Sequence, residues 1–340
     1  MIALHDAEKE HIKEKTFPNF ALMKISAWHK ARGDSVTWWK WDRKAPVEDG
    51  QITILGGTGK EVFDRELMEY NAQFDRVYSS KVFDFTPKNP YLPEDTIKGG
   101  TGYGMYTELA PEIDAMFPDY AIYPECDYAI GYVTRGCPNA CAWCVVPEKE
   151  GDIKPYRRWR EIVRTDTEKL VLMDNNILSC EYGILELESL IDSGYALDLN
   201  QGMDARLLDE RIAGIVGRLK WIKYIRFSCD SLPQIDTIHR AAALLAPYGI
   251  KPYRLFIYLL VTKDIENAAR RVERLRELNG ISLYAQAERN DSKGIIPNRA
   301  QLEFAQRYVY GRAYRKETWA EYCKKKKSLF LGRLHIWTQI

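Results

Sequence analysis

Three of the seven cysteines, Cys137, Cys141 and Cys144, lie within eight residues with the spacing C-x3-C-x2-C. Such clustering in a cytosolic chain indicates metal or redox chemistry rather than a disulfide framework. Three thiolates on one loop can ligate three irons of a 4Fe–4S cluster and leave the fourth iron without a protein ligand. An open coordination position is what a metal centre needs to bind a substrate directly.

The alternative for this loop is a structural zinc site completed by a histidine or a fourth cysteine. The nearest further ligand is Cys126 on the upstream side, and no histidine lies close in the sequence. The other cysteines, Cys180, Cys229 and Cys323, are scattered along the chain. We therefore expect an iron–sulfur cluster rather than zinc.

The elements that must position this loop alternate between β-rich apolar runs and amphipathic stretches. The clearest amphipathic stretch is expected to start after Asp264 and to stop at Asn279-Gly280. The expected strands are residues 128–134, 169–174, 196–201, 224–230, 254–261 and 282–288. Six βα units predict a parallel sheet with right-handed crossovers. Six are too few for the eight-stranded barrel, so we expect a partial, open (β/α)6 TIM barrel with the cysteine loop at the carboxyl end of its first strand.

Polar and apolar residues alternate within the expected strands. Arg226, Ser228 and Asp230, for example, alternate with Ile225 and Phe227, and Cys229 continues the apolar set. Apolar side chains should pack against the helices, which leaves the polar set in the lumen. A polar lumen predicts a ligand cavity, because a barrel filled only for stability carries branched apolar residues there.

The first 120 or so residues follow a different pattern. A helix is expected at 18–31, strands at 36–41 and 76–83, and a strand running into a glycine turn at 97–100. This favours a small Rossmann-like α/β domain with a linker within residues 107–123. The expected domains are therefore 1–120, 121–295 for the partial barrel, and 296–340 for a basic, aromatic helical extension.

Composition limits the classes of function. The chain has 340 residues, of which 46% are hydrophobic and 29% charged, and its net charge is +1. A net charge this close to zero produces no overall electrostatic attraction to nucleic acid or to a membrane surface. No apolar run approaches about 18 residues, and the first residues do not resemble a signal peptide. We expect a cytoplasmic protein without a membrane partner.

Together the loop and the elements resemble the radical S-adenosylmethionine (SAM) superfamily. The resemblance covers the segment GYVTRGCPNACAWCVVP at residues 131–147, with Trp143 before the third cysteine, and the six βα units. It implies that SAM chelates the open iron through its amino and carboxylate groups. It also implies that an electron from a donor such as flavodoxin or ferredoxin cleaves SAM to methionine and a 5′-deoxyadenosyl radical, which abstracts hydrogen from a substrate.

The resemblance further implies which side chains bind SAM. Three form the turn after the second strand, where the family contacts the SAM amino group. Two follow the third strand, among them an arginine expected to face the SAM carboxylate. Two end the fourth strand, near the expected ribose hydroxyls, and each of these polar residues has a turn or cap role as its alternative. With the aromatic residue of the loop, the set is Trp143, Asp174, Asn175, Asn176, Asp204, Arg206, Ser228 and Asp230.

The amino-terminal domain resembles the cobalamin-binding domain that precedes many radical SAM barrels. Its position, the opening Phe17-Pro-Asn-Phe-Ala-Leu and the pair Gly99-Gly100 carry this resemblance. Asp6 and His11 do not form the Asp-x-His-x-x-Gly motif, although many family members bind cobalamin without that histidine. We expect a degenerate, cofactor-free version, with a cobalamin-loaded one as the alternative. Too few further cysteines precede or follow the barrel for a second cluster.

The carboxyl-terminal segment from Arg307 to Arg333 holds nine basic and two acidic residues interleaved with aromatic ones. It could bind nucleic acid through phosphate contacts and base stacking, or form a terminal helix docked on the barrel. The sequence thus predicts a radical SAM enzyme that modifies an unidentified nucleic acid, nucleoside or peptide. The alternatives are a cobalamin-dependent radical SAM methyltransferase and a non-catalytic, metal-bearing nucleic-acid-binding protein.

Overall fold

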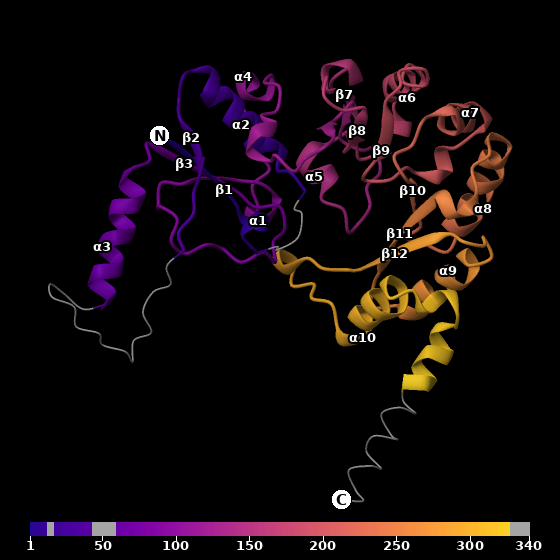
Figure 1. Cartoon of the computed structure of the whole chain (residues 1–340). Coiled ribbons are helices and arrows are strands. Elements are labelled where there is room, and N and C mark those ends of the chain that lie inside the picture. Colours follow the sequence, from indigo (N-terminus) through magenta and orange to yellow (C-terminus); the bar gives the residue numbers. More distant parts are fainter. Residues whose placement is uncertain (12–16, 43–58, 327–340) are drawn as a thin grey trace, which may run out of the picture. The chain divides into compact units, whose positions relative to one another are not determined.

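The structure is a computed structural model that describes residues 1–11, 17–42 and 59–326 (Figure 1). The chain divides into two compact units, Met1–Cys126 and Asp127–Ile340. Both contain helices and sheets of parallel strands, so the expected α/β class is confirmed. None of the described helices is long and apolar enough to cross a membrane.

The first unit contains a four-stranded parallel sheet of order β2-β1-β3-β4. Its strands are β1 (Ile2–Asp6), β2 (Val36–Trp38), β3 (Arg76–Ser80) and β4 (Ile97–Gly99). Its helices are α1 (Ala7–His11), α2 (Phe20–Ala31), α3 (Gly59–Ala72) and α4 (Pro111–Asp114). Leu4 of β1 packs with α2, whereas Ala3 packs in a second cluster with Tyr70 of α3, so the sheet has a core on each face.

The expected elements of this unit are present but shorter than predicted. Helix α2 begins at Phe20 rather than at residue 18, because Asn19 caps it by accepting a hydrogen bond from the Leu22 backbone N–H at 3.2 Å. The strands expected at 36–41 and 76–83 end at Trp38 and Ser80. The central strand β1 was not predicted at all.

The second unit contains six parallel strands in two sheets, of order β5-β8-β9 and β10-β11-β12. The strands are β5 (Ala129–Gly131), β8 (Lys169–Leu172), β9 (Ala196–Leu199), β10 (Ile225–Ser228), β11 (Leu255–Val261) and β12 (Ser282–Ala287). Parallel bridges Leu197↔Trp221 and Met203↔Phe227 connect residues around β9 with residues around β10. Each of the six expected strands is therefore present, although the ends are trimmed by a few residues. The expected strand 128–134 is broken, since its end forms β6 (Thr134–Arg135), which pairs antiparallel with β7 (Lys154–Pro155).

Helices follow the strands along one side of these sheets (Figure 1). They are α6 (Glu181–Glu188), α7 (Glu210–Arg218), α8 (Gln234–Leu245) and α9 (Ile265–Leu275). Helix α9 begins where the sequence predicted, because the Asp264 side chain accepts a hydrogen bond from the Asn267 backbone N–H at 3.1 Å. It ends at Leu275, before the expected Asn279-Gly280 stop.

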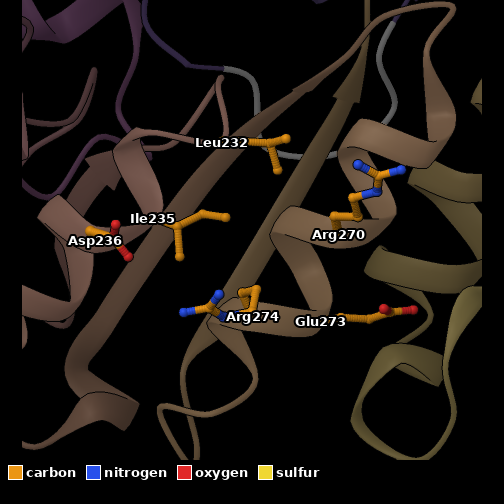
Figure 2. A pocket seen from close by; sticks show the side chains of 6 residues that line it. All are labelled: Leu232, Ile235, Asp236, Arg270, Glu273 and Arg274. Atoms are coloured by element: carbon orange, nitrogen blue, oxygen red, sulfur yellow. The ribbon is translucent and has the colours of Figure 1, made fainter.

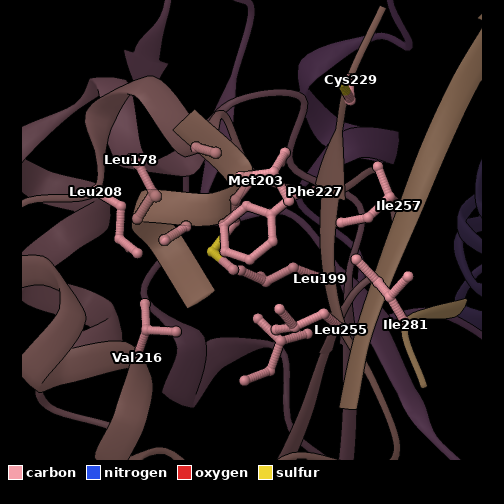
Figure 3. Packing of buried hydrophobic residues seen from close by; sticks show 14 of the residues in the cluster. Leu178, Leu199, Met203, Leu208, Val216, Phe227, Cys229, Leu255, Ile257 and Ile281 are labelled. Carbon is pink, nitrogen blue, oxygen red and sulfur yellow. The ribbon is translucent and has the colours of Figure 1, made fainter. Parts of the chain in front are cut away.

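The alternation of the strands separates an apolar side from a polar one. In β11, every second residue from Leu255 to Val261 is buried, and the residues between them are half-buried. The buried side forms the larger core, where Phe227, Ile257 and Val216 of α7 take part (Figure 3). Cys229 belongs to this core, as expected from its position in the alternation.

The carboxyl-terminal segment is helical but irregular. A short α10 (Arg299–Leu302) continues into the π-helix Glu303–Tyr310, and residues 319–326 are again helical. The ring of Tyr308 is buried and contacts Trp319 and Tyr322 at 5.2 and 5.6 Å between centroids. Tyr310, by contrast, is 72% exposed. Within the described part of this segment, most aromatic side chains therefore pack against one another, and their faces are not available for stacking on bases.

Candidate metal and cofactor site

The cysteine loop starts directly after β6 and is closed at its base. The Cys137 backbone N–H donates to the Gly151 carbonyl at 3.1 Å, so the chain returns to its starting point after α5 (Val146–Glu150). Gly136 has φ +86°, and a Cβ there would lie 2.2 Å from the carbonyl oxygen of Asp152. Only glycine fits this position, so the turn before the first cysteine requires a glycine at residue 136.

All three cysteines of the loop are half-buried and none is in a disulfide. Burial raises the pKa of Cys141, and the charges of Cys144 and Cys137 raise it further. Burial also raises the pKa of Cys144, although a hydrogen bond from the Val146 backbone N–H to its Sγ, at 3.4 Å, opposes this rise. The loop thus brings three cysteines close enough that ionisation of one disfavours ionisation of the others. Trp143 is 46% exposed and faces solvent for a large part of its surface.

Glu150, at the end of α5, fastens the loop to the neighbouring strand. One of its carboxylate oxygens, Oε2, accepts hydrogen bonds from Arg135 Nε at 2.9 Å, the Gly136 backbone N–H at 3.1 Å and Asn175 Nδ2 at 3.0 Å. The Glu150 side chain is 7% exposed. A single buried carboxylate therefore joins the start of the loop, its end and the turn after β8.

Asp174, after β8, holds the segment that leads into the loop. Its carboxylate accepts hydrogen bonds from the backbone N–H groups of Val133 and Thr134 and from Thr134 Oγ1, the last at 2.7 Å. Burial raises the pKa of Asp174 to about 6, because desolvation of the charged form outweighs these hydrogen bonds. The carboxylate is occupied by protein donors, so its expected contact with SAM stays a prediction.

The other two residues of this turn differ in their environment. The Asn175 amide donates to Glu150, as described. Asn176 is 3% exposed, and its Oδ1 has no hydrogen-bond partner among the residues that the structure describes. A buried acceptor without a donor is unfavourable by about 1–3 kcal/mol, so Asn176 presents an oxygen that a ligand donor would satisfy.

Asp204 and Arg206, which follow β9, form a pair at the edge of the loop. Arg206 donates to the Asp204 carboxylate through Nε at 2.8 Å and through Nη2 at 2.6 Å. Burial opposes ionisation of Asp204, but the hydrogen bonds from Arg206 outweigh it and lower the pKa of this carboxyl. Asn139 of the cysteine loop donates to the same carboxylate at 3.3 Å. The charge of Arg206 also interacts with the thiols of Cys141 and Cys137.

The fourth strand ends at a second buried network. Asp230 Oδ1 accepts a hydrogen bond from the Leu260 backbone N–H at 2.7 Å, and burial raises the pKa of Asp230. Arg271 of α9 is 1% exposed and donates to the carbonyls of Cys229 and Leu260, both at 2.7 Å. These contacts bind the ends of β10 and β11 together. Ser228 is half-buried in β10 on the polar side.

The donor set around the loop fits a thiolate-ligated cluster. Three thiols lie on one loop, and the charges of Arg206 and Asp230 interact with Cys141. The unpartnered Asn176 oxygen offers an acceptor of the kind that an ammonium group needs. Within residues 1–11, 17–42 and 59–326, no group of three or more His, Cys, Asp and Glu side chains is already placed to hold a metal ion. The fit therefore rests on the chemistry of the donors.

Two residues that fasten the site were not predicted from the sequence. Glu150 lies in a short helix with no motif of its own, and its partner Asn175 is 25 residues away. Arg271 lies among four other charged residues of α9, and its contact with Cys229 spans 42 residues. The position of Arg271 on the apolar stripe of α9, next to Val272 and between Ala268 and Leu275, is the signal that could have found it.

A separate cavity of about 390 Å³ lies between α8 and α9 (Figure 2). Its charged side chains are Asp236, Arg270, Glu273 and Arg274. None of the predicted cofactor-binding residues lines it.

The glycine turn of the first unit has a structural explanation. Gly100 has φ +101°, and a Cβ there would lie 2.5 Å from the carbonyl oxygen of Lys81. The close approach that this glycine permits is thus one between two backbone segments. Asp6 is buried and accepts a hydrogen bond from the Tyr123 hydroxyl.

No protein-family model matches the chain, and no curated protein matches it.

Proposed function

We propose that this chain is a radical SAM enzyme in which Cys137, Cys141 and Cys144 hold a 4Fe–4S cluster. The observation that carries the proposal is the position of these thiols. They lie on one closed loop after the first of six parallel strands, beside the charges of Arg206 and Asp230 from later strands. In α/β proteins, ligands bind at the carboxyl ends of parallel strands, where these side chains occur.

Six parallel strands in two three-stranded sheets, with helices along one side, support an open (β/α)6 barrel as the architecture of the second unit. In the first unit, the order β2-β1-β3-β4 with a core on both faces supports a Rossmann-like domain. When bound, the cluster and SAM would take one electron from an external donor and would yield methionine and a 5′-deoxyadenosyl radical, which would remove a hydrogen atom from the substrate.

The protein's own residues position and shield this chemistry. Glu150 and Asp174 fix the loop against the end of β8, and Asn176 offers a buried acceptor for the SAM ammonium group. Arg206 is the candidate partner of the SAM carboxylate. Its pairing with Asp204 leaves half of the Arg206 side chain exposed, so the guanidinium keeps donors for a second carboxylate.

Cobalamin receives no support from the first unit, because packing against Lys81 accounts for the Gly100 turn. A nucleic-acid-binding role receives little support from the carboxyl-terminal segment, because Tyr308 and Tyr314 are buried. We therefore propose the enzyme without a corrinoid.

The test is anaerobic reconstitution of the chain with iron and sulfide, followed by an assay for 5′-deoxyadenosine from SAM and dithionite. We expect a brown protein that forms 5′-deoxyadenosine, and a Cys141→Ala variant that forms none. Cys323→Ser is the matched control, since this cysteine lies outside the loop and its replacement should leave the product unchanged. A colourless protein that holds one zinc, or a loaded protein that never cleaves SAM, would overturn the proposal.

A further inference from the structure

The polar side of β11 and β12 carries neighbouring aromatic side chains, with Arg226 of β10 beside them. The parallel register places Arg226 beside Phe256, and Tyr258 beside Tyr284. All four point away from the helices, because they alternate with the buried residues of their strands. We call Phe256, Tyr258 and Tyr284 the aromatic platform.

Tyr258 is held in place by two hydrogen bonds at its hydroxyl. Its hydroxyl donates to the Asn200 carbonyl at 2.9 Å and accepts a hydrogen bond from Arg226 Nη1 at 3.2 Å. Gly202 has φ +84°, and a Cβ there would lie only 3.3 Å from the Tyr258 ring. The glycine therefore gives the ring its space, and the two hydrogen bonds fix its orientation.

The rings of the platform support one another and leave surface exposed. Tyr258 meets Phe256 edge-on at 5.3 Å and Tyr284 edge-on at 5.9 Å between centroids. Phe256 and Tyr284 are nearly parallel, with an interplanar angle of 24°. Tyr284 remains 38% exposed. A rigid platform of this kind can stack a planar ring without first paying the entropy of ordering its own side chains.

The charge of this face is balanced. Asp198 accepts from Arg226 Nε at 2.6 Å and from Nη2 at 2.7 Å, which neutralises the guanidinium. The same guanidinium lies over the Phe256 ring at 5.0 Å. With its charge matched, Arg226 supports the platform and does not attract a phosphate. The face therefore suits an uncharged planar ring.

A neutral amide lies on the same side of the sheet. Gln286 follows Tyr284 by two residues in β12, so both side chains point to one face. Gln286 is exposed, and a carboxamide offers both donors and acceptors to the edge of a ring. A nucleobase uses a stacking face and edge hydrogen bonds together, whereas the side chain of phenylalanine uses only the face.

We propose that the aromatic platform binds the nucleobase of the substrate, which makes the substrate a nucleoside or a nucleotide base. The assignment of the ring to the substrate rests on the proposed radical SAM function. Binding of the ring itself does not depend on that function, so the two ideas can fail separately.

The test is binding of adenosine, guanosine, cytidine and uridine to the full chain before reconstitution, measured by saturation-transfer NMR and titration calorimetry. N-acetyltyrosinamide serves as the peptide-like probe. We expect at least one nucleoside to bind, and Tyr284→Leu to weaken it about 5- to 150-fold, the range that stacking of one base supports. Tyr284→Phe should retain most of the affinity, because the ring is kept. Tyr310→Leu is the matched control, since this exposed tyrosine lies outside the platform.

Several results would overturn the nucleobase assignment. They are the absence of nucleoside binding, equal binding by the wild type and Tyr284→Leu, and binding of N-acetyltyrosinamide alone. Complete displacement of every nucleoside by S-adenosylhomocysteine would assign the platform to the adenine of the cofactor instead. Cleavage of SAM is measured separately, so a failed binding test leaves the proposed function standing, and failed cleavage leaves the binding result intact.

Discussion

Replacing Glu150 by alanine tests whether one buried carboxylate holds the cysteine loop. The change removes the shared acceptor of Arg135, Gly136 and Asn175, whose donors lie 2.9, 3.1 and 3.0 Å from Glu150 Oε2. It leaves the Arg135 side chain, which is 22% exposed, without this counter-charge.

The magnitude follows from the number and kind of these contacts. A hydrogen bond to a charged group contributes about 1.5–3 kcal/mol, and removal of one member of a buried ion pair costs about 3–5 kcal/mol. Because the three contacts share one oxygen, they do not add fully. We expect Glu150→Ala to lower the local stability of the loop by about 3–5 kcal/mol. Glu150→Gln keeps an oxygen acceptor but loses the charge, so its effect should be smaller.

The assay is hydrogen–deuterium exchange of the peptide covering residues 133–152, before reconstitution. A local loss of about 3–5 kcal/mol corresponds to a rise of about two to three and a half orders of magnitude in exchange rate, since about 1.4 kcal/mol is tenfold. Iron bound after reconstitution should fall in parallel. The matched control is Glu181→Ala, which removes a carboxylate that pairs with Arg211 on the surface. It should leave exchange in this peptide unchanged.

Equal exchange in Glu150→Ala and the wild type would refute this reasoning, because the loop would then keep its structure without the shared acceptor. Equal increases in Glu150→Ala and Glu181→Ala would refute it as well, since the effect would then be global.

Three further changes test the supports of the site. Arg271→Met leaves two strand-end carbonyls without their donor, so we expect a loss of about 2–4 kcal/mol and a fall in the thermal midpoint of about 5–15 °C, measured by circular dichroism. Gly136→Ala should abolish iron binding, because its Cβ would meet Asp152, whereas Gly151→Ala, with φ +69° but open space, should retain more iron. Burial raises the pKa of Asp174 to about 6 from 3.8, so the folded chain holds the carboxyl proton more tightly than the unfolded chain. The contribution of this protonated carboxyl to stability is full below about pH 4 and falls by about 3 kcal/mol as the pH rises through 6. NMR titration of the Asp174 carboxyl carbon should give a midpoint near 6.

The sequence predicted the elements whose signal is local. Helix α9 has an N-cap, Asp264, and an apolar stripe, and β11 alternates over seven residues, so both were found nearly at their true bounds. Strand β1 was missed because its five residues end in His5 and Asp6, which normally argue against a buried strand. Both are buried because distant partners satisfy them: Ser79 for His5 and Tyr123 for Asp6.

The same division between local and distant signals applies to the site. The spacing of the cysteines identified the loop, since that motif is contiguous in sequence. The hydrogen bonds that Asp174 and Arg206 make within the protein could not be predicted, because they depend on the partners that folding provides. The expected contact of Asp174 with a ligand stays a prediction. Its carboxylate accepts hydrogen bonds from the backbone N–H groups of Val133 and Thr134, and these partners left no signal in the sequence. A polar residue at a strand end therefore indicates a site without saying whether it binds the ligand or supports the residues that do.

Buried charges recur at the strand ends of the second unit, and they share one arrangement. Asp174 joins the end of β8 to the segment after β5, Glu150 joins that segment to the turn after β8, and Arg271 joins β10 to β11. In each case the charged group bonds to backbone, so the cost of burying it is offset by donors or acceptors that the strand ends would otherwise leave unpaired. Apolar packing alone could not satisfy those groups. Fixed strand ends are what a site needs when several loops must hold one ligand within a fraction of an ångström, and this explains why the buried charges gather at that edge of the sheets.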